Sequence, residues 1–269
     1  MKIAFIGGGS MGEAMLAALL DKRLALPDDV SVSDISDDRC QYLKQKYGVE
    51  VTSNNKLAAV RGEVIILAVK PQHLTEAITE LKGQLGPDQL VMSIIAGAEI
   101  KTLTAGLSYS SVVRVMPNAP AQIGGGMSMW TATVEVTPQQ KEQAGSILGA
   151  VGREIYVDDE KYLDMATAVS GSGPAYFFLF VEALVDAAVG IGLSRDMAEE
   201  MVLQTMLGSG RLIQESGKSP AELRRMVTSP GGTTAEALLE FEKGGFNDMV
   251  KRAVKAAYEK AKSLGGEQK

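Results

Sequence analysis

Residues Gly7–Gly12 (GGGSMG) have the glycine spacing that lets a backbone approach a phosphate group closely. They directly follow the apolar run Ile3–Ile6 and open a stretch with helical spacing of apolar residues, Met11–Leu20. In this context the first glycine permits a tight turn, the second leaves room for a pyrophosphate, and the third lets helix and strand pack closely. Free N–H groups at the helix start would then face the phosphates. The pattern predicts a dinucleotide site; a plain glycine-rich turn is the alternative.

Asp34 stands 22 residues after Gly12, at the end of a second apolar strand. An acidic residue about 20 residues beyond such a loop accepts hydrogen bonds from the adenosine ribose, and its charge repels a 2′-phosphate. Asp34 therefore favours NADH over NADPH. Two alternatives stay open: Asp34 only starts a turn, or it turns away and lets Ser33, Ser36 and Arg39 hold a phosphate. We expect the cofactor to be NADPH or NADH.

Three further strand ends have small or proline-rich sequences, at Ala68–Pro71, Ile95–Gly97 and Met116–Pro120. Ligands of doubly wound sheets bind beyond the carboxyl ends of the strands, where a nicotinamide can lie against such backbone. Lys70 could act as a catalytic acid, with a cation flanking a helix as the alternative. We expect His73 at the surface, and the sequence leaves open whether either residue moves a proton.

A second cluster, residues 227–236 (VTSPGGTTAE), combines two glycines with several hydroxyl groups. Thr233 and Glu236 fit a capping box, so a helix is expected to begin there. Gly231 and Gly232 remove side chains just before it, which leaves bare N–H groups at the positive end of the helix dipole. The hydroxyl groups around this end belong to Ser229, Thr233 and Thr234. The cluster predicts a site for a small carboxylate; a well-capped helix after a turn is the alternative.

The composition excludes several other kinds of chemistry. The 269 residues carry a net charge of −6 and only 5% aromatic side chains, which argues against nucleic-acid binding. With one cysteine (Cys40) and one histidine (His73), an internal disulfide, a thiolate zinc cluster and a histidine-rich metal site are excluded. We therefore expect no metal and assign the chemistry to a cofactor. One cysteine and no visible targeting segment are typical of a cytoplasmic protein.

The elements that must position these residues change in kind near residue 158. Before it, apolar runs alternate with helical patterns, which predicts a parallel, doubly wound, Rossmann-like sheet. The predicted strands are Ile3–Ile6, Val30–Val32, Val49–Val51, Val64–Val69, Leu90–Ile95 and Val112–Met116. After it only helical periodicity is found. Helix starts are marked at Thr137-Pro138, before this change, and at Ser219-Pro220, after it. The fold class is therefore α/β, with a dinucleotide-binding domain (1–158) followed by an all-α domain for substrate binding and dimerisation (159–269).

The segment Ser170–Tyr176 is rich in glycine and serine and precedes Phe177–Ile191, which is apolar nearly all round. Glu182 and Asp186 would be costly in a helix that spans a membrane alone. We therefore expect no membrane span. A helix buried on every side, in a small helical domain, instead suggests a partner subunit.

Together these segments resemble the pyrroline-5-carboxylate reductase family over nearly the whole chain. The resemblance is carried by Gly7–Gly12, Ala68–Pro71, Val115–Asn118, Ser170–Tyr176 and above all Val227–Thr234. It implies reduction of the cyclic imine 1-pyrroline-5-carboxylate to L-proline by hydride from NAD(P)H, the last step of proline biosynthesis.

The resemblance also implies roles for particular residues. The residues that line the cofactor would be Ile6, Gly7, Gly8, Gly9, Ser10, Met11, Asn55, Ala68, Val69, Lys70, Pro71, Ile94, Ile95 and Ala96, beside Asp34 from the spacing above. Ser229, Gly232 and Thr233 would hold the substrate carboxylate, with Gly231 beside them. Thr234 would hydrogen-bond the ring nitrogen as the catalytic residue, and Glu160 matches a position near the substrate. The resemblance further implies a dimer interlocked through the helical domain, in which the Thr234 loop faces the partner's cofactor. In some members of the family, such dimers assemble into decamers.

The chain departs from the family pattern at two places. Members that prefer NADPH tend to have small, amide or basic residues where Asp34 and Ile35 stand, and several carry a polar residue where Met226 stands. The alternatives to this function are another two-domain NAD(P)-dependent reductase, acting on imines or β-hydroxyacids, and a non-catalytic regulator that senses dinucleotides. The first usually relies on a Lys or Asp in the helical domain, and no suitable Lys is found in residues 170–193. The carboxylate site argues against the second.

Overall fold

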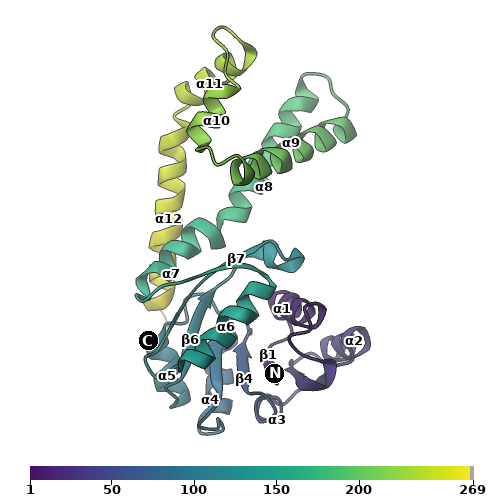
Figure 1. Ribbon diagram of the computed structural model, residues 1–269, viewed down its shortest axis with the longest axis vertical. Coiled ribbons are helices and arrows are strands. Elements are labelled where there is room, and N and C mark those ends of the chain that lie inside the picture. The colour runs from purple at the N-terminus through teal and green to yellow at the C-terminus, as the bar shows by residue number, and fades with distance from the viewer. Residues whose placement is uncertain (267–269) are drawn as a thin grey trace. The chain divides into compact units, whose positions relative to one another are not determined.

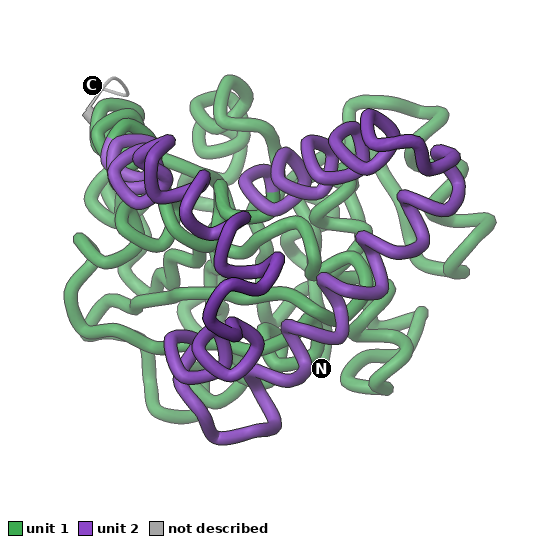
Figure 2. The backbone as a smooth tube through the Cα atoms, turned by 90° about the horizontal axis from the view of Figure 1, so that it is seen from above, with its two compact units in different colours: residues 1–174, 256–269 green, residues 175–255 purple. Residues whose placement is uncertain are grey.

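The computed structural model describes residues 1–266, which form two compact units. The first unit comprises Met1–Pro174 together with the chain from Ala256 on, and the second comprises Ala175–Lys255 (Figure 2). The boundary between these compact units follows Pro174, and the second half of the last helix belongs to the first unit. We describe each unit by itself.

The first unit is built on an eight-stranded sheet with the order β3-β2-β1-β4-β5-β6-β7-β8 (Figure 1). Its strands are β1 (Ile3–Ile6), β2 (Val30–Ser33), β3 (Glu50–Thr52), β4 (Val64–Leu67), β5 (Leu90–Ser93), β6 (Val112–Met116), β7 (Gly126–Ala132) and β8 (Gly152–Tyr156). The prediction of a doubly wound, Rossmann-like sheet followed by helices is confirmed, with two corrections.

First, the sheet is not wholly parallel, because β7 pairs antiparallel with β6. The link Pro117–Gly125 contains only the short 3₁₀ turn η3 (Ala119–Ile123) and is shorter than the dozen or so residues that a parallel crossover needs. Second, the sequence analysis missed β7 and β8. The exposure of β7 alternates from Gly126 to Trp130, which is the signature of a strand with one face buried.

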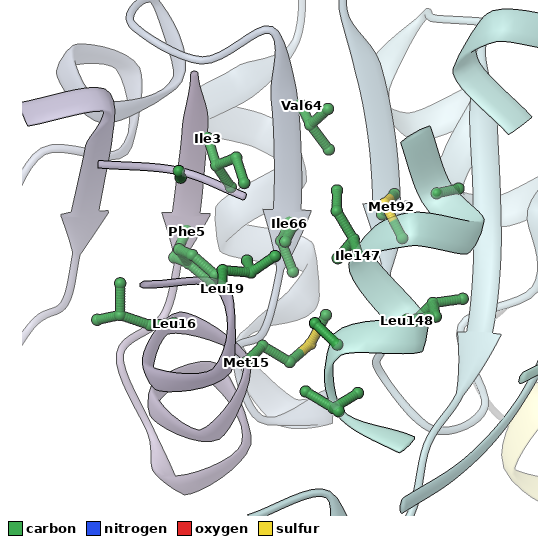
Figure 3. Packing of buried hydrophobic residues seen from close by; sticks show 14 of the residues in the cluster. Ile3, Phe5, Met15, Leu16, Leu19, Val64, Ile66, Met92, Ile147 and Leu148 are labelled. Atoms are coloured by element: carbon green, nitrogen blue, oxygen red, sulfur yellow. The ribbon is translucent and has the colours of Figure 1, made fainter. Parts of the chain in front are cut away.

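Helices cover both faces of the sheet, because successive side chains of the central strands point to opposite sides. On one face Ile3 and Phe5 of β1 pack in a cluster with α1 (Ser10–Asp21), α2 (Asp37–Tyr47) and α6 (Pro138–Ala150) (Figure 3). On the other face Ala4 and Ile6 pack in a second cluster. Its helices are α3 (Asn55–Ala59), α4 (Leu74–Leu81) and α5 (Ile100–Leu107).

Within the first unit, an ion network centred on the buried Arg114 holds the segment around Glu160 and Asp164 against the sheet. Arg114 of β6 is 4% exposed, and its guanidinium lies 2.7 Å from Glu160 Oε1 and 3.1 Å from Asp164 Oδ1. Glu160 Oε1 also accepts a hydrogen bond of 2.8 Å from the Ile100 N–H. Arg114 therefore joins β6 to the start of α5 and to α7 (Lys161–Ala166). Short α7 continues through a π-helical turn, η4 (Thr167–Gly171).

The second unit is wholly helical, as expected. It contains α9 (Arg195–Glu215), α10 (Pro220–Met226), α11 (Thr233–Lys243), nearly all of α8 (Gly173–Gly190) and the first half of α12 (Phe246–Gly266). Its small buried cluster consists of Val185, Ala198 and Val202.

Helix α8 is not buried on every side within one chain, so the predicted burial would need the partner subunit that the sequence also suggested. Phe177, Phe178 and Leu179 are 65%, 63% and 66% exposed. The stretch Lys161–Gly190 is one helix among the described residues that is long and apolar enough to cross a membrane by length and composition, and 17% of its apolar 18-residue window is buried. Those two properties do not separate a membrane span from a helix that another chain covers.

We expect Arg114→Met to lower the free energy of unfolding by about 3 kcal/mol, because it leaves two partly buried carboxylates without their cation. The control is Arg61→Met, since Arg61 pairs with Glu50 where both side chains are more than half exposed. That change should cost less than about 0.5 kcal/mol. Urea unfolding followed by Trp130 fluorescence measures both. Equal losses for the two variants would contradict a structural role for the Arg114 network.

Candidate functional site

The turn from β1 to α1 brings three backbone segments into close contact. Gly7 has φ +101°, and a Cβ on it would lie 2.8 Å from backbone atoms of Ala68 and Val69. A Cβ on Gly12 would lie 2.6 Å from the carbonyl oxygen of Gly7. These two positions therefore require glycine, one for its φ and the close approach of β4, and the other for the approach of α1.

Gly9 differs from its neighbours because no atom lies within 4 Å of the position that its Cβ would take. It is the N-cap of α1 and has no side chain with which to cap the helix. The first N–H groups of any α-helix lack partners inside the helix and attract anions. Open space beside Gly9 and unpaired N–H groups at the start of α1 together fit the pyrophosphate of a dinucleotide.

One cavity of about 250 Å³ lies at this loop. Seven predicted cofactor residues line it, namely Gly7, Gly9, Asp34, Asn55, Ala68, Val69 and Lys70. The other eight do not: Ile6, Gly8, Ser10, Met11, Pro71, Ile94, Ile95 and Ala96. The structure thus brings together the ends of β1, β2 and β4, and the cofactor role of the whole set stays a prediction.

The cavity has further lining residues, of which the sequence analysis had assigned only Ser33 to the cofactor, as an alternative phosphate ligand. They are Ser33, Ile35, Ser53, His73, Glu76, Ala77 and Glu80. The last four follow one face of a helix at its natural spacing, so the helix after Pro71 could have indicated them. Ser53 directly follows β3 and could have been found by the strand-end rule. His73 therefore lies at the cavity, about 42% exposed, rather than on an unrelated surface.

Asp34 makes two hydrogen bonds at the rim of this cavity. Its Oδ2 accepts the Gly8 N–H at 2.9 Å, and its Oδ1 accepts the Ser36 N–H at 3.0 Å. The second bond is the turn-starting role that the sequence left open. The first ties the carboxylate to the glycine loop. Asp34 therefore does both, and it lines the cavity, while its contact with the adenosine ribose stays a prediction.

The Ser229–Thr234 cluster belongs to the second unit. Gly231 has φ +69°, and Gly232, in extended conformation, donates its N–H to Ser229 O at 3.1 Å. Helix α11 begins at Thr233 with Gly232 as its N-cap. The N–H groups of Thr233 and Thr234 are the first two of the helix and therefore have no partner inside it. The segment presents backbone donors and hydroxyl groups together, as a carboxylate site requires.

The predicted capping box of Thr233 and Glu236 is wrong. The turn at Gly231–Gly232 starts the helix one residue earlier than expected, so Thr233 lies within the helix and cannot cap it. The capping boxes of Thr137 with Gln140 and of Ser219 with Glu222 are both formed. The missing box leaves the N–H groups at the start of α11 open to a ligand.

Glu160, predicted near the substrate, has its Oε1 already bound to Arg114 and to the Ile100 N–H. Within one chain it holds the start of α5 and α7 in place, and its substrate role stays a prediction.

A glycine loop that opens onto a cavity at the carboxyl ends of a doubly wound sheet defines a dinucleotide-binding protein. Two families match the chain: "NADP oxidoreductase coenzyme F420-dependent" over residues 2–97 and "Pyrroline-5-carboxylate reductase dimerisation" over residues 160–264. Relatives that match the chain over its full length carry the name of the second family. The pyrroline-5-carboxylate reductase of Synechocystis is 41% identical over 265 residues, which are 98% of either chain.

Solved structures show the same likeness. That of a pyrroline-5-carboxylate reductase from Coxiella burnetii has a TM-score of 0.90 at 38% identity, and that from Plasmodium falciparum, with NADP bound, has 0.89 at 33%. Each covers 98% of both chains. The chain belongs to the pyrroline-5-carboxylate reductase family, and the resemblance inferred from the sequence is confirmed.

We expect Gly9→Val to weaken dinucleotide binding by about tenfold or more, because its side chain fills the space beside the start of α1. Its backbone conformation suits valine, and nothing lies near its Cβ, so the thermal midpoint should stay unchanged.

Gly12→Val is the matched control. Its Cβ meets the Gly7 carbonyl, so it should lower the free energy of unfolding by about 2 kcal/mol. Calorimetric titration with NAD⁺ and NADP⁺, beside thermal melts, separates the two effects. Wild-type affinity in Gly9→Val would remove the loop from the cofactor site.

Proposed function

We propose that the protein reduces the C=N bond of 1-pyrroline-5-carboxylate to give L-proline, with NADPH or NADH as the reductant, as the last step of proline biosynthesis. The observation that carries the proposal is likeness along the full length to proteins named pyrroline-5-carboxylate reductase, at up to 41% identity in the relatives described. Both the glycine loop and the Ser229–Thr234 cluster are present in the chain.

The residues suit imine reduction, which needs a well-placed donor and relief of charge at nitrogen but no nucleophile. The glycine loop and the start of α1 would hold the dinucleotide, which supplies hydride when bound. Ser229 and Gly231–Thr233 would bind the substrate carboxylate through N–H and hydroxyl groups. The Thr234 hydroxyl would hydrogen-bond the ring nitrogen. Catalysis then depends on proximity and on fixed dipoles, in a chain with a single histidine.

The exposed apolar surface of the second unit supports a homodimer. Monomers seldom leave so many large apolar side chains uncovered, and residues 160–264 match a dimerisation family. We place the dimer contact on the helical unit, with the Ser229–Thr234 segment of one protomer facing the partner's cofactor. The proposal extends to decamers that are assembled from such dimers. The reaction, on a small substrate in the cytoplasm, needs neither a membrane nor nucleic acid.

The direct test is oxidation of NADH and NADPH in the presence of 1-pyrroline-5-carboxylate, followed by absorbance, with proline measured as the product. We expect proline to appear in equal amount to the oxidised cofactor with at least one of the two. No oxidation with either, or oxidation without proline, would refute the proposed reaction. A dinucleotide-sensing regulator would bind cofactor and give no turnover.

Thr234→Ala should lower kcat by about 100-fold, because it removes a donor aimed at developing charge, while cofactor affinity stays the same. Thr228→Ala is the control, since the Thr228 hydroxyl already donates to Arg224 O at 2.6 Å. Its kcat should stay close to wild type. Unchanged turnover in Thr234→Ala would remove this residue from the active site.

Phe178→Arg should shift the protein from dimer to monomer in sedimentation velocity and abolish turnover, because it buries a charge in the proposed contact. Val134→Arg, at an apolar residue of the first unit that is 95% exposed, is the control and should remain dimeric. A dimeric, active Phe178→Arg variant would place the dimer contact elsewhere.

A further inference from the structure

Glu13, in the first turn of α1, is the centre of a polar cluster beside the glycine loop. Its side chain is 17% exposed and accepts hydrogen bonds from Lys46 Nζ at 2.9 Å, Tyr47 OH at 2.8 Å and Tyr42 OH at 3.1 Å. It also forms a salt bridge with Arg39. All four partners lie on α2, so Glu13 fixes that helix to the helix that opens the cofactor site.

Glu13 stays ionised at every pH at which the enzyme would work. Burial raises its pKa, but the hydrogen bonds from Lys46, Tyr47, Arg39 and Tyr42 outweigh burial and lower the pKa to about 2. The pairing with Arg39 is therefore a constant feature of the site.

Arg39 lies against the same loop residue as Asp34. Its Nε donates to Gly8 O at 2.5 Å, while Asp34 Oδ2 accepts the Gly8 N–H at 2.9 Å. Both side chains therefore bind the backbone of Gly8. Arg39 is the cation of this cluster that also binds the glycine loop, with Nη2 engaged by Glu13 and Nε by the loop.

The other groups that could hold a 2′-phosphate also have partners. Ser33 Oγ donates to Asn55 Oδ1 at 2.6 Å, and Ser36 Oγ accepts the Arg39 N–H at 3.3 Å. Asp34 is held by two backbone N–H groups and does not turn away. A ribose hydroxyl would find a hydrogen-bond acceptor here, the Asp34 carboxylate. A 2′-phosphate would be repelled by the same carboxylate and would find Arg39 already paired with Glu13.

We propose that Glu13 is a specificity-determining residue, which keeps Arg39 from binding a 2′-phosphate and so makes this enzyme prefer NADH to NADPH. The inference rests on the proposed function for its nicotinamide cofactor. The fold itself does not exclude a 2′-phosphate, since the structure of the Plasmodium falciparum relative has NADP bound. The discrimination therefore comes from this chain's own side chains at the rim.

The test measures binding without turnover, by calorimetric titration of the full-length protein with AMP and with adenosine 2′,5′-bisphosphate, which differ only in the 2′-phosphate. Wild type should bind AMP more tightly. Glu13→Gln keeps an acceptor for α2 but no longer carries the charge that pairs with Arg39. It should tighten the bisphosphate by about tenfold, the worth of one charge-assisted hydrogen bond, and leave AMP unchanged. The ratio of kcat/KM for NADH to that for NADPH should fall by a similar factor.

Two controls isolate the cause. Asp38→Asn removes one negative charge from exposed surface in the first turn of α2, and it should leave the ratio unchanged. The double variant Glu13→Gln with Arg39→Met should lose the gain, because the gain requires the released cation.

Tighter binding of the bisphosphate than of AMP by wild type overturns the proposal, and this result needs no variant. A gain that survives in the double variant, or that Asp38→Asn reproduces, overturns it as well. Failure of 1-pyrroline-5-carboxylate to react would refute the proposed function instead and leave the binding result standing.

Discussion

The structure depends on the close contact between Gly7 and the backbone of Ala68 and Val69. A Cβ at Gly7 would lie 2.8 Å from those atoms, and one at Gly12 would lie 2.6 Å from the Gly7 carbonyl. Only without those side chains can β1, the end of β4 and the start of α1 meet. Their meeting leaves unpaired N–H groups and open space beside Gly9, which is why the cavity lies there.

The two units differ in how much of their apolar surface they bury. The first buries a core on both faces of its sheet, and the Arg114 network joins the chain beyond residue 158 to that sheet. The second buries little and leaves Phe177, Phe178 and Leu179 largely exposed. Since such a surface is stable in water only when covered, the helical unit depends on another chain. The proposed reaction divides in the same way, with cofactor binding in one unit and carboxylate binding in the other.

The sequence predicted well those features that repeat or that need one residue type. Buried parallel strands such as Val64–Leu67 are continuous apolar runs, and the glycine loop has few other physical explanations. Strand β7 escaped because its buried positions include Gly126, Ser128 and Thr131, so its sequence has neither an apolar run nor an apolar alternation. The helix at Thr233 was placed correctly, but the cap was not, since a left-handed Gly231 shifts the start by one residue.

Side-chain partnerships between distant segments could not be predicted. Nothing local in the sequence pairs Arg114 with Glu160, or Glu13 with Arg39, because both contacts exist only once the sheet and its helices have formed. Glu76 and Glu80 are a different case, because the helical spacing after Pro71 could have indicated them. The exposure of α8 also depends on how much a single chain can cover, which no pattern within the helix reveals.

The central claim is that the Ser229–Thr234 corner grips a carboxylate opposite a nicotinamide. A crystal structure of the assembled protein with L-proline and the oxidised dinucleotide tests it most directly. The account predicts the proline carboxylate on the N–H groups of that corner, with its ring nitrogen at the Thr234 hydroxyl and the nicotinamide against the ring. Proline bound elsewhere, with the corner far from every dinucleotide in both protomers, would contradict it.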